Sequence, residues 1–224
     1  MTTTPLLRAP RDIASWMWFP RHLEPGLQAQ YALAARIAEI AARHGLLTAP
    51  RIVSAWSLDG VRVPQVCAVV QPTGALDDPA VLAAVVAARP DELPERAVPG
   101  EIELEGPGSW YDADGAAHAD DGLLRITVDL LPGDPWVQVE VFHDVWMPYD
   151  FTGRPHPEVY QCNASRLAAA LTDINALLGA EAEPGELTYF GRAVALGVEN
   201  SFDDDGEPLD VTDLIKAAAQ RYGG

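Results

Sequence analysis

Residues 124–142 read LRITVDLLPGDPWVQVEVF, and this stretch decides the fold. Apolar and polar side chains alternate from Leu124 to Leu131 and again from Trp136 to Phe142, which is typical of strands with one buried and one wet face. The connecting residues 132–135, PGDP, are turn formers. The pattern therefore predicts consecutive strands of an antiparallel meander.

A second pair of strands is expected upstream. Residues 52–58 and 61–70 flank Asp59 and Gly60, a dipeptide typical of tight hairpins. Pro64 lacks a backbone N–H to donate, so the second of these runs is expected at a sheet edge or at a bulge.

Two further segments extend this β pattern. Residues 101–105 alternate strictly between Glu and an aliphatic residue, which predicts a strand with one charged, wet face. The aromatic-rich residues 13–20 are expected to pack on the core, either as a short strand or as a helix.

Two long segments have helical periodicity. Residues 27–44 carry an apolar stripe and end before Gly45, a residue suited to a helix C-terminal cap. The second helix is expected over residues 164–178, with Asn163 as its N-cap and Gly179 after its end. Shorter helices are expected after Asp78-Pro79 and after Asp210.

This order of elements predicts an α+β fold. We expect one compact domain over residues 1–224, with a mobile connector over residues 90–100. Both long helices should pack on one face of an antiparallel sheet, with short helices at the periphery. The side chains expected to be buried between sheet and helices are Ile126, Val128, Val139, Val141, Leu167, Leu171 and Ile174.

Length and composition agree with a globular protein. The 224 residues suffice for one sizeable core without metal or disulfide support. No apolar run reaches the roughly 20 residues that span a bilayer, and residues 1–5 do not resemble a leader peptide. We therefore expect a cytoplasmic protein without membrane contact. Cys67 and Cys162 lie far apart and are expected to be reduced thiols.

The charge is strongly acidic and uneven. The formal net charge is −18, yet residues 1–62 contain seven Arg against four acidic residues, so the rest of the chain carries −21. This distribution disfavours nucleic-acid binding, which needs clustered cations. It indicates either a charged contact face or a need for solubility alone.

Aspartate-rich turns raise the question of calcium. An EF-hand loop that contained Asp112 and Asp114 would begin at Trp110, which cannot ligate a metal. A loop anchored on Gly206 would place Thr212 where a bidentate Glu belongs. No cofactor fingerprint occurs either, so we expect neither a metal nor a cofactor.

Catalytic motifs are also missing from the sequence. Cys162, His143 and Asp144 could form a nucleophilic set, but adjacent strand residues point to opposite faces. An enzyme remains an alternative, with a pocket at the end of the sheet near His143, Asp144, Tyr149 and Asp150.

Two stretches are candidates for binding a partner. Residues 91–121 contain ten acidic residues against a single Arg. Residues 146–151 are aromatic and broken by proline, so they either form a rigid contact surface or close the core. The candidate binding residues are Glu101, Glu103, Glu105, Asp112, Asp114, Trp146, Tyr149 and Asp150.

The C-terminal third of the chain resembles uncharacterised actinobacterial immunity-like proteins. The resemblance rests on turn and packing motifs, namely Trp146, Pro148 and Asp150, then Asn163 with Arg166 and Leu167, and Thr188-Tyr189-Phe190-Gly191. It implies a small acidic antidote that blocks the active site of a toxin, and it transfers no functional residue.

These observations lead to three hypotheses. The first is a non-catalytic acidic protein that binds a basic protein partner, most concretely an immunity or antitoxin protein that inhibits a toxin. The second is the enzyme with the pocket described above. The third is a structural protein or homo-oligomer that sets its basic N-terminal segment against acidic neighbours. For the first hypothesis, changing Glu101, Glu103 and Glu105 to Gln is expected to slow association and to leave thermal stability nearly unchanged.

Overall fold

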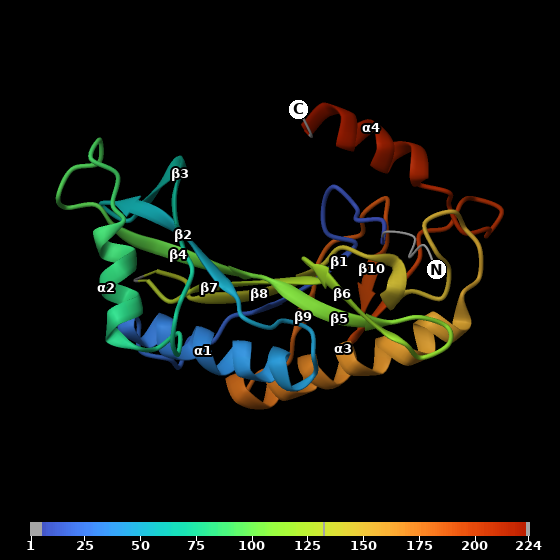
Figure 1. Ribbon diagram of the computed structural model, residues 1–224, viewed down its shortest axis with the longest axis horizontal. Coiled ribbons are helices and arrows are strands. Elements are labelled where there is room, and N and C mark those ends of the chain that lie inside the picture. The colour runs from blue at the N-terminus through green and yellow to red at the C-terminus, as the bar shows by residue number, and fades with distance from the viewer. Residues whose placement is uncertain (1–5, 132, 223–224) are drawn as a thin grey trace.

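A seven-stranded sheet organises the protein (Figure 1). The structure is a computed structural model that describes residues 6–131 and 133–222. The expectations for residues 1–5 and for Pro132 of the 132–135 turn lie outside these residues. The strand order is β3-β2-β4-β7-β8-β1-β9, and every neighbouring pair is antiparallel. The α+β prediction is confirmed.

The bounds of the sheet strands are β1 (Ala14–Trp18), β2 (Arg51–Leu58), β3 (Val61–Val70), β4 (Val98–Glu105), β7 (Leu124–Asp129), β8 (Trp136–Val141) and β9 (Glu183–Pro184). Two separate hairpins pair β5 (Pro107–Tyr111) with β6 (Ala117–Asp121), and β10 (Arg192–Val194) with β11 (Gly197–Glu199). The helices are α1 (Leu27–Arg43), α2 (Pro79–Ala87), the 3-10 turn η1 (Asp144–Trp146), α3 (Pro157–Leu178) and α4 (Thr212–Tyr222).

Strands β7 and β8 pair as their alternation predicts. Ile126 lies opposite Val139, and Val128 lies opposite Val137. These four side chains are buried, while the residues between them point to the other face of the sheet. The central hairpin thus fixes which face of the sheet is the core.

The aromatic stretch near the N-terminus is a strand, and it lies inside the sheet. β1 pairs with β8 on one side and with β9 on the other. Trp16 and Trp18 are fully buried on its core face, and Trp18 Nε1 donates to Asn175 Oδ1 of α3 at 2.8 Å. A segment from the first twenty residues is therefore held between two segments that follow it by more than one hundred residues.

The β2–β3 hairpin forms as predicted. Asp59 and Gly60 both have positive φ, at 53° and 82°, as a tight turn of this kind requires. β3 is an edge strand, and the pairing of β2 with β3 shifts register between Ala55 and Ser57. Pro64 thus sits where the missing N–H is tolerated.

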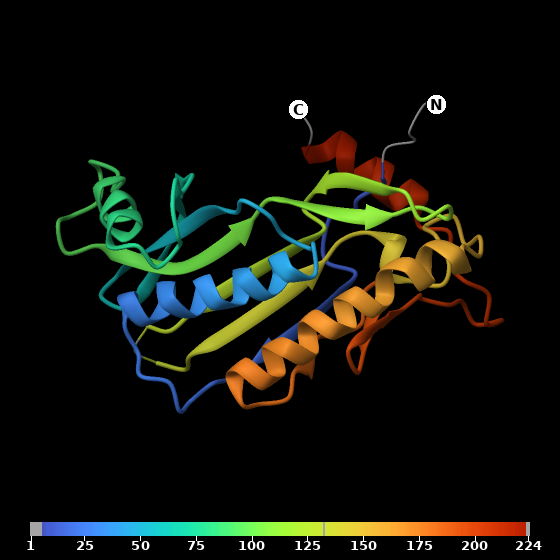
Figure 2. The same ribbon diagram turned by 60° about the horizontal axis from the view of Figure 1, so that its bottom comes forward.

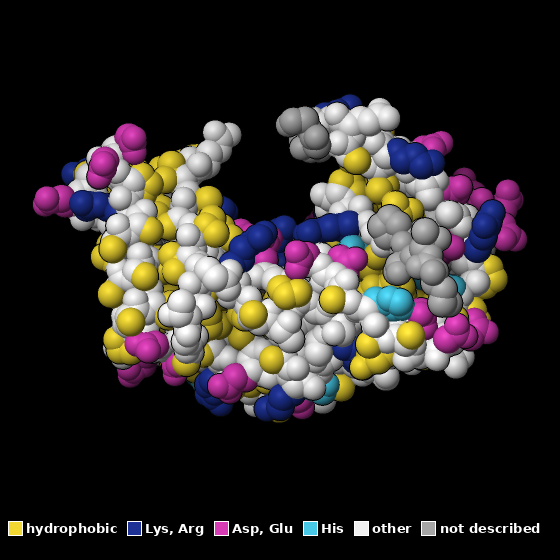
Figure 3. All heavy atoms as spheres, viewed as in Figure 1, with side chains coloured by type: hydrophobic (Ala, Val, Ile, Leu, Met, Phe, Trp, Pro, Cys, Tyr) yellow, Lys and Arg dark blue, Asp and Glu magenta, His cyan; other side chains and the backbone are white. Residues whose placement is uncertain are grey.

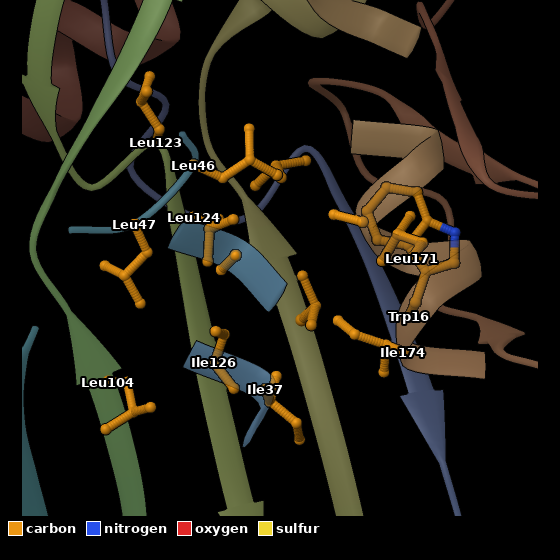
Figure 4. Packing of buried hydrophobic residues seen from close by; sticks show 14 of the residues in the cluster. Trp16, Ile37, Leu46, Leu47, Leu104, Leu123, Leu124, Ile126, Leu171 and Ile174 are labelled. Carbon is orange, nitrogen blue, oxygen red and sulfur yellow. The ribbon is translucent and has the colours of Figure 1, made fainter. Parts of the chain in front are cut away.

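Helices α1 and α3 both cover the same face of the sheet (Figure 2). Each joins two strands that run in the same direction but are separated in the sheet by other strands, so no parallel pair forms. The seven side chains expected in the core are all buried. Leu171 and Ile174 of α3 and Ile37 of α1 point toward the sheet (Figure 4).

Helix α3 begins earlier than predicted, at Pro157 instead of Ala164. The prediction that Asn163 is the N-cap was wrong: Asn163 is buried within the helix, where its side chain bonds both the N–H and the carbonyl of Tyr111, at 2.9 and 2.7 Å. Pro157 suits the first helical turn because it has no N–H to leave unpaired. The predicted end is confirmed, since Gly179 follows the helix with φ 61°.

The remaining helices and the connector agree closely with the sequence. Asp78 caps α2 through Ala80 N–H at 2.8 Å, and Asp210 bonds Thr212 N–H at 3.0 Å at the start of α4. The connector is shorter than predicted, because residues 98–100 belong to β4.

Candidate functional site: the open face of the sheet

Among the residues that the structure describes, no helix lies along the centre of the sheet face opposite α1 and α3 (Figures 1 and 2). We call this face the open face. It is bounded by a hairpin arm, residues 56–97, and by a C-terminal arm, residues 201–222 that includes α4. Figure 3 shows a hollow between the two arms, with Lys and Arg side chains across its bottom. The central side chains of this face are Arg51, Val53, Glu103, Glu105, Arg125, Thr127, Gln138 and Glu140.

Arg125 is the centre of a charge network on the open face. Its guanidinium lies 3.0 Å from Glu105, and 3.6 Å from both Glu103 and Glu140. Arg51 also contacts Glu105, at 2.8 Å. Strand pairing brings these groups together, because Glu140 is the cross-strand partner of Arg125 and Glu105 is the partner of Arg51.

The carboxylates of this network differ in their affinity for protons. Burial favours the neutral form of Glu105, but hydrogen bonds and positive charge from Arg51 and Arg125 outweigh it and lower the pKa of Glu105. Burial raises the pKa of Glu140, and Arg125 only partly offsets that effect. The open face therefore contains one glutamate whose ionised form is stabilised, Glu105, and one whose ionised form is destabilised, Glu140.

The aromatic ring of Phe142 contacts the guanidinium groups of two arginines. The guanidinium carbon of Arg8 lies 4.5 Å from the centre of the Phe142 ring, and that of Arg125 lies 5.0 Å from it. The negative face of the ring attracts both charges. The open cavity between this pair and α4 measures about 560 Å³ and is lined on the α4 side by Ile215 and Ala218.

The other end of the hollow lies against the hairpin arm. A cavity of about 440 Å³ is lined there by Trp56, Arg62, Glu101, Asp129 and Asp134, among others. Arg62 forms an ion pair with Glu101. Burial raises the pKa of Glu101, while Arg62 opposes that shift.

The glutamates predicted to bind a partner thus lie on the open face, but they are not a free acidic surface. Glu103 and Glu105 contact Arg125 of the neighbouring strand β7, and Glu101 contacts Arg62 of β3, two strands away. A charge count along the sequence could not reveal this neutralisation, because the arginines lie elsewhere in the chain. Two of the seven arginines of the basic N-terminal segment, Arg51 and Arg62, contact these acidic residues.

Asp112 and Asp114 lie apart from the open face, at the turn of the β5–β6 hairpin. Asp112 Oδ1 accepts the N–H groups of Asp114 and Ala116, at 3.0 and 2.9 Å. A hydrogen bond with His118, together with these backbone bonds, lowers the pKa of Asp112. The carboxylate of Asp112 therefore stabilises its own turn.

The three remaining candidates lie at the end of η1 and in the loop that follows it. Trp146 is fully buried and closes the core, which was one of the two interpretations of this stretch. Tyr149 exchanges backbone hydrogen bonds with the Asn200 side chain, at 3.1 and 2.7 Å. Asp150 accepts the N–H groups of Thr152 and Arg154 at 2.8 and 3.0 Å, so it orders a turn.

The residues suggested for an enzyme do not converge on one point. His143 is buried, and its Nδ1 bonds the carbonyl of Leu7 at 2.9 Å. Asp144 accepts the N–H of Phe151 at 2.9 Å. A cavity of about 320 Å³ contains Asp144 and Asp150 together with His156, but neither His143 nor Tyr149 lines it. Burial raises the pKa of Asp144 within this cavity.

The sequence did not single out Arg8, Arg51, Arg125 and Glu140 as site residues. A usable signal was present, because the alternation in residues 136–142 places Glu140 and Phe142 on the face opposite Val139 and Val141. What could not be seen was the register that sets Arg125 among three glutamates.

A comparison of the chain with models of known families, with curated proteins and with solved structures found no match. Within residues 6–131 and 133–222, no helix is long and apolar enough to cross a membrane. The same residues contain no group of three or more potential metal-ligating His, Cys, Asp or Glu side chains.

Proposed function

We propose that this protein is a non-catalytic binding protein that holds a basic protein partner against the open face of its sheet. An immunity or antitoxin protein that blocks a toxin is the most concrete form of this function. The observation that carries the proposal is a sheet covered by long helices on one face only, with a hollow, charged opposite face between two arms.

The ion pairs of the open face favour a protein-binding surface over a face that is merely exposed to solvent. Its glutamates and arginines are held by cross-strand contacts before any partner arrives, so their positions are largely fixed. Ordering such long side chains normally costs free energy on association, and a prearranged network reduces that cost. A partner with complementary charges could exchange ion pairs with this network.

The charge of the arms supports a basic partner. The hairpin arm carries six acidic residues against three arginines, and three of the acidic residues, Asp91, Glu92 and Glu95, lie in the loop after α2. Residues 203–205 of the C-terminal arm are three consecutive aspartates. Negative charge on both arms would attract a basic protein and speed its association.

The homo-oligomer hypothesis is weaker than the sequence suggested. It relied on a basic N-terminal segment free to meet acidic neighbours. Arg43, Arg51 and Arg62 instead contact Asp173, Glu105 and Glu101 of the same chain. Those cations are already satisfied internally.

The enzyme hypothesis has one supporting observation. Asp144 is a buried carboxyl group with a raised pKa in a cavity that also contains Asp150 and His156, and such groups often serve as acids or bases. Changing Asp144 to Asn would remove its ability to act as an acid or base and would leave the open face intact. Under the binding proposal, this variant should retain the partner as the wild type does.

The test of the binding proposal is to block the open face. Gln138 lies in the middle of that face, and Gln28 is exposed on α1 on the covered side. The immobilised wild type, Gln138→Trp and Gln28→Trp proteins would be compared for proteins retained from an extract of the native host. We expect the wild type and Gln28→Trp to retain the same basic protein, and Gln138→Trp to lose it. Equal retention by all three, with matching melting temperatures, would refute the proposal.

A further inference from the structure

An apolar groove lies outside the open face, between residues 187–192 and residues 200–209. It has a volume of about 390 Å³, within the range of about 300–1,000 Å³ that is typical of small-ligand sites. Leu187, Tyr189 and Phe202 line it with exposed fractions of 67%, 74% and 47%. Single exposed apolar residues are common on protein surfaces, but three around one hollow are a feature of contact sites.

The walls of this groove are rigid. Thr188 Oγ1 bonds the Gly191 carbonyl at 3.0 Å and accepts the Phe190 N–H at 3.1 Å, which fixes the turn that carries Tyr189. The Ser201 hydroxyl donates to the Thr188 carbonyl at 2.9 Å and ties the two walls together. Large side chains on a fixed backbone bind a partner with little loss of conformational entropy.

Exposed acidic residues adjoin lining residues of the groove in sequence, and we call them its acidic rim. Glu186 precedes Leu187, and residues 203–205, all aspartate, follow Phe202. The arginine of the groove, Arg192, contacts Glu199 at 2.6 Å and is thereby neutralised. The apolar surface therefore sits in a negative environment.

We propose that this groove binds a basic peptide segment that carries an aliphatic or aromatic anchor side chain. The anchor would lie between Tyr189, Leu187 and Phe202, and flanking Lys or Arg residues would face the acidic rim. Charge complementarity selects this occupant over a neutral or acidic segment. The inference adds a second contact surface to the proposed function, for a basic protein partner, but it can be tested without that partner.

The test begins with selection of peptides from a random displayed library on the full-length chain, and a Leu187→Ser, Tyr189→Ser double variant is then compared with the wild type. The most enriched peptide would then be synthesised with a fluorescent label and titrated by anisotropy. We expect a peptide with an apolar anchor flanked by Lys or Arg, and a loss of affinity of about tenfold or more in the double variant. Because both side chains are exposed, the double variant should melt as the wild type does.

A matched control uses two exposed valines of the hairpin arm, Val61 and Val86, at 69% and 48% exposure. Changing both to Ser should leave the affinity for the peptide unchanged, as should Gln138→Trp on the open face. Enriched peptides without basic residues, or with equal affinity for the Leu187→Ser, Tyr189→Ser variant, would overturn the groove proposal. A peptide that loses binding only in Gln138→Trp would also overturn it, while supporting the open face as the binding surface.

Discussion

The two faces of the sheet are built from the same strands but are held together by different forces. On the covered face, Ile126 and Val139 pack against α1 and α3 and gain stability from apolar burial. On the open face, Arg125 and its glutamates balance the cost of partial burial with ion pairs. The difference teaches that one sheet can stabilise the fold through apolar packing on one face and hold partly buried ion pairs on the other.

The largest effect should come from a cavity in the covered face. Ile126→Ala removes buried methyl groups from the centre of the core and is expected to lower the free energy of unfolding by about 2–5 kcal/mol. Gln138→Ala on the open face should change it by less than about 0.5 kcal/mol. Urea denaturation of both variants measures the contrast. Equal losses would mean that the open face is also a packed interior.

A smaller loss is expected when the charge network loses its centre. Arg125→Met leaves three half-buried carboxylates without their shared cation and should cost about 1–3 kcal/mol. The control is Arg192→Met, which breaks the exposed pair with Glu199 and should cost less than about 1 kcal/mol. Thermal melts at low salt measure both losses of stability. Equal losses in the two variants would contradict a stabilising role for Arg125 at the centre of the network.

The dependence of stability on pH should separate two glutamates of the network. The lowered pKa of Glu105 means that its contribution is present above about 4.5, its ordinary pKa, and is lost as the pH falls through the lowered value. Glu105→Gln should therefore destabilise the protein at neutral pH, and the gap from the wild type should close in acid.

Glu140 should behave in the opposite way. Its raised pKa means that the wild type loses stability as the pH rises from about 4.5 through the raised value. Glu140→Gln removes this loss, so the variant should gain relative to the wild type over that range. Melting temperatures across a pH series measure how the stability of each variant relative to the wild type changes with pH. This difference should fall with rising pH for Glu105→Gln and rise for Glu140→Gln, and changes in the same direction would contradict the two pKa shifts.

The smallest effect on stability is expected on the hairpin arm. Changing Asp91, Glu92 and Glu95 to Asn or Gln should alter the free energy of unfolding by less than about 0.5 kcal/mol. The same change should slow association with a basic partner and flatten its salt dependence, because exposed charges act over a screening length of about 8 Å. If the association rate changes neither with these substitutions nor with the salt concentration, the acidic residues of this arm do not steer the partner.

The ion pairs revise the effect expected for Glu101, Glu103 and Glu105. Replacing all three by Gln should now alter thermal stability, since Arg62 and Arg51 would lose their carboxylate partners and Arg125 would keep only Glu140. The hairpin-arm variant is therefore the cleaner test of steering.

Local patterns predicted the elements well, and long-range pairing explains what they missed. The alternation of residues 124–142 and the Asp59-Gly60 turn depend on near neighbours, so the sequence alone was sufficient for them. The start of α3 was misplaced because Asn163 resembles a cap, whereas its side chain pairs with Tyr111 across the fold. The charge network depends on strand register, which no local pattern specifies.

The position of β1 has a consequence for how the chain is made. During synthesis, the strand that contains Trp16 and Trp18 emerges early, yet its partners are residues 137–141 and 183–184. Pairings so distant in sequence close slowly, and unpaired apolar strands are prone to aggregate in the meantime. The two tryptophans therefore leave the ribosome before their partner strands have been made, and a ribosome stalled before residue 136 would present them unburied to chaperones.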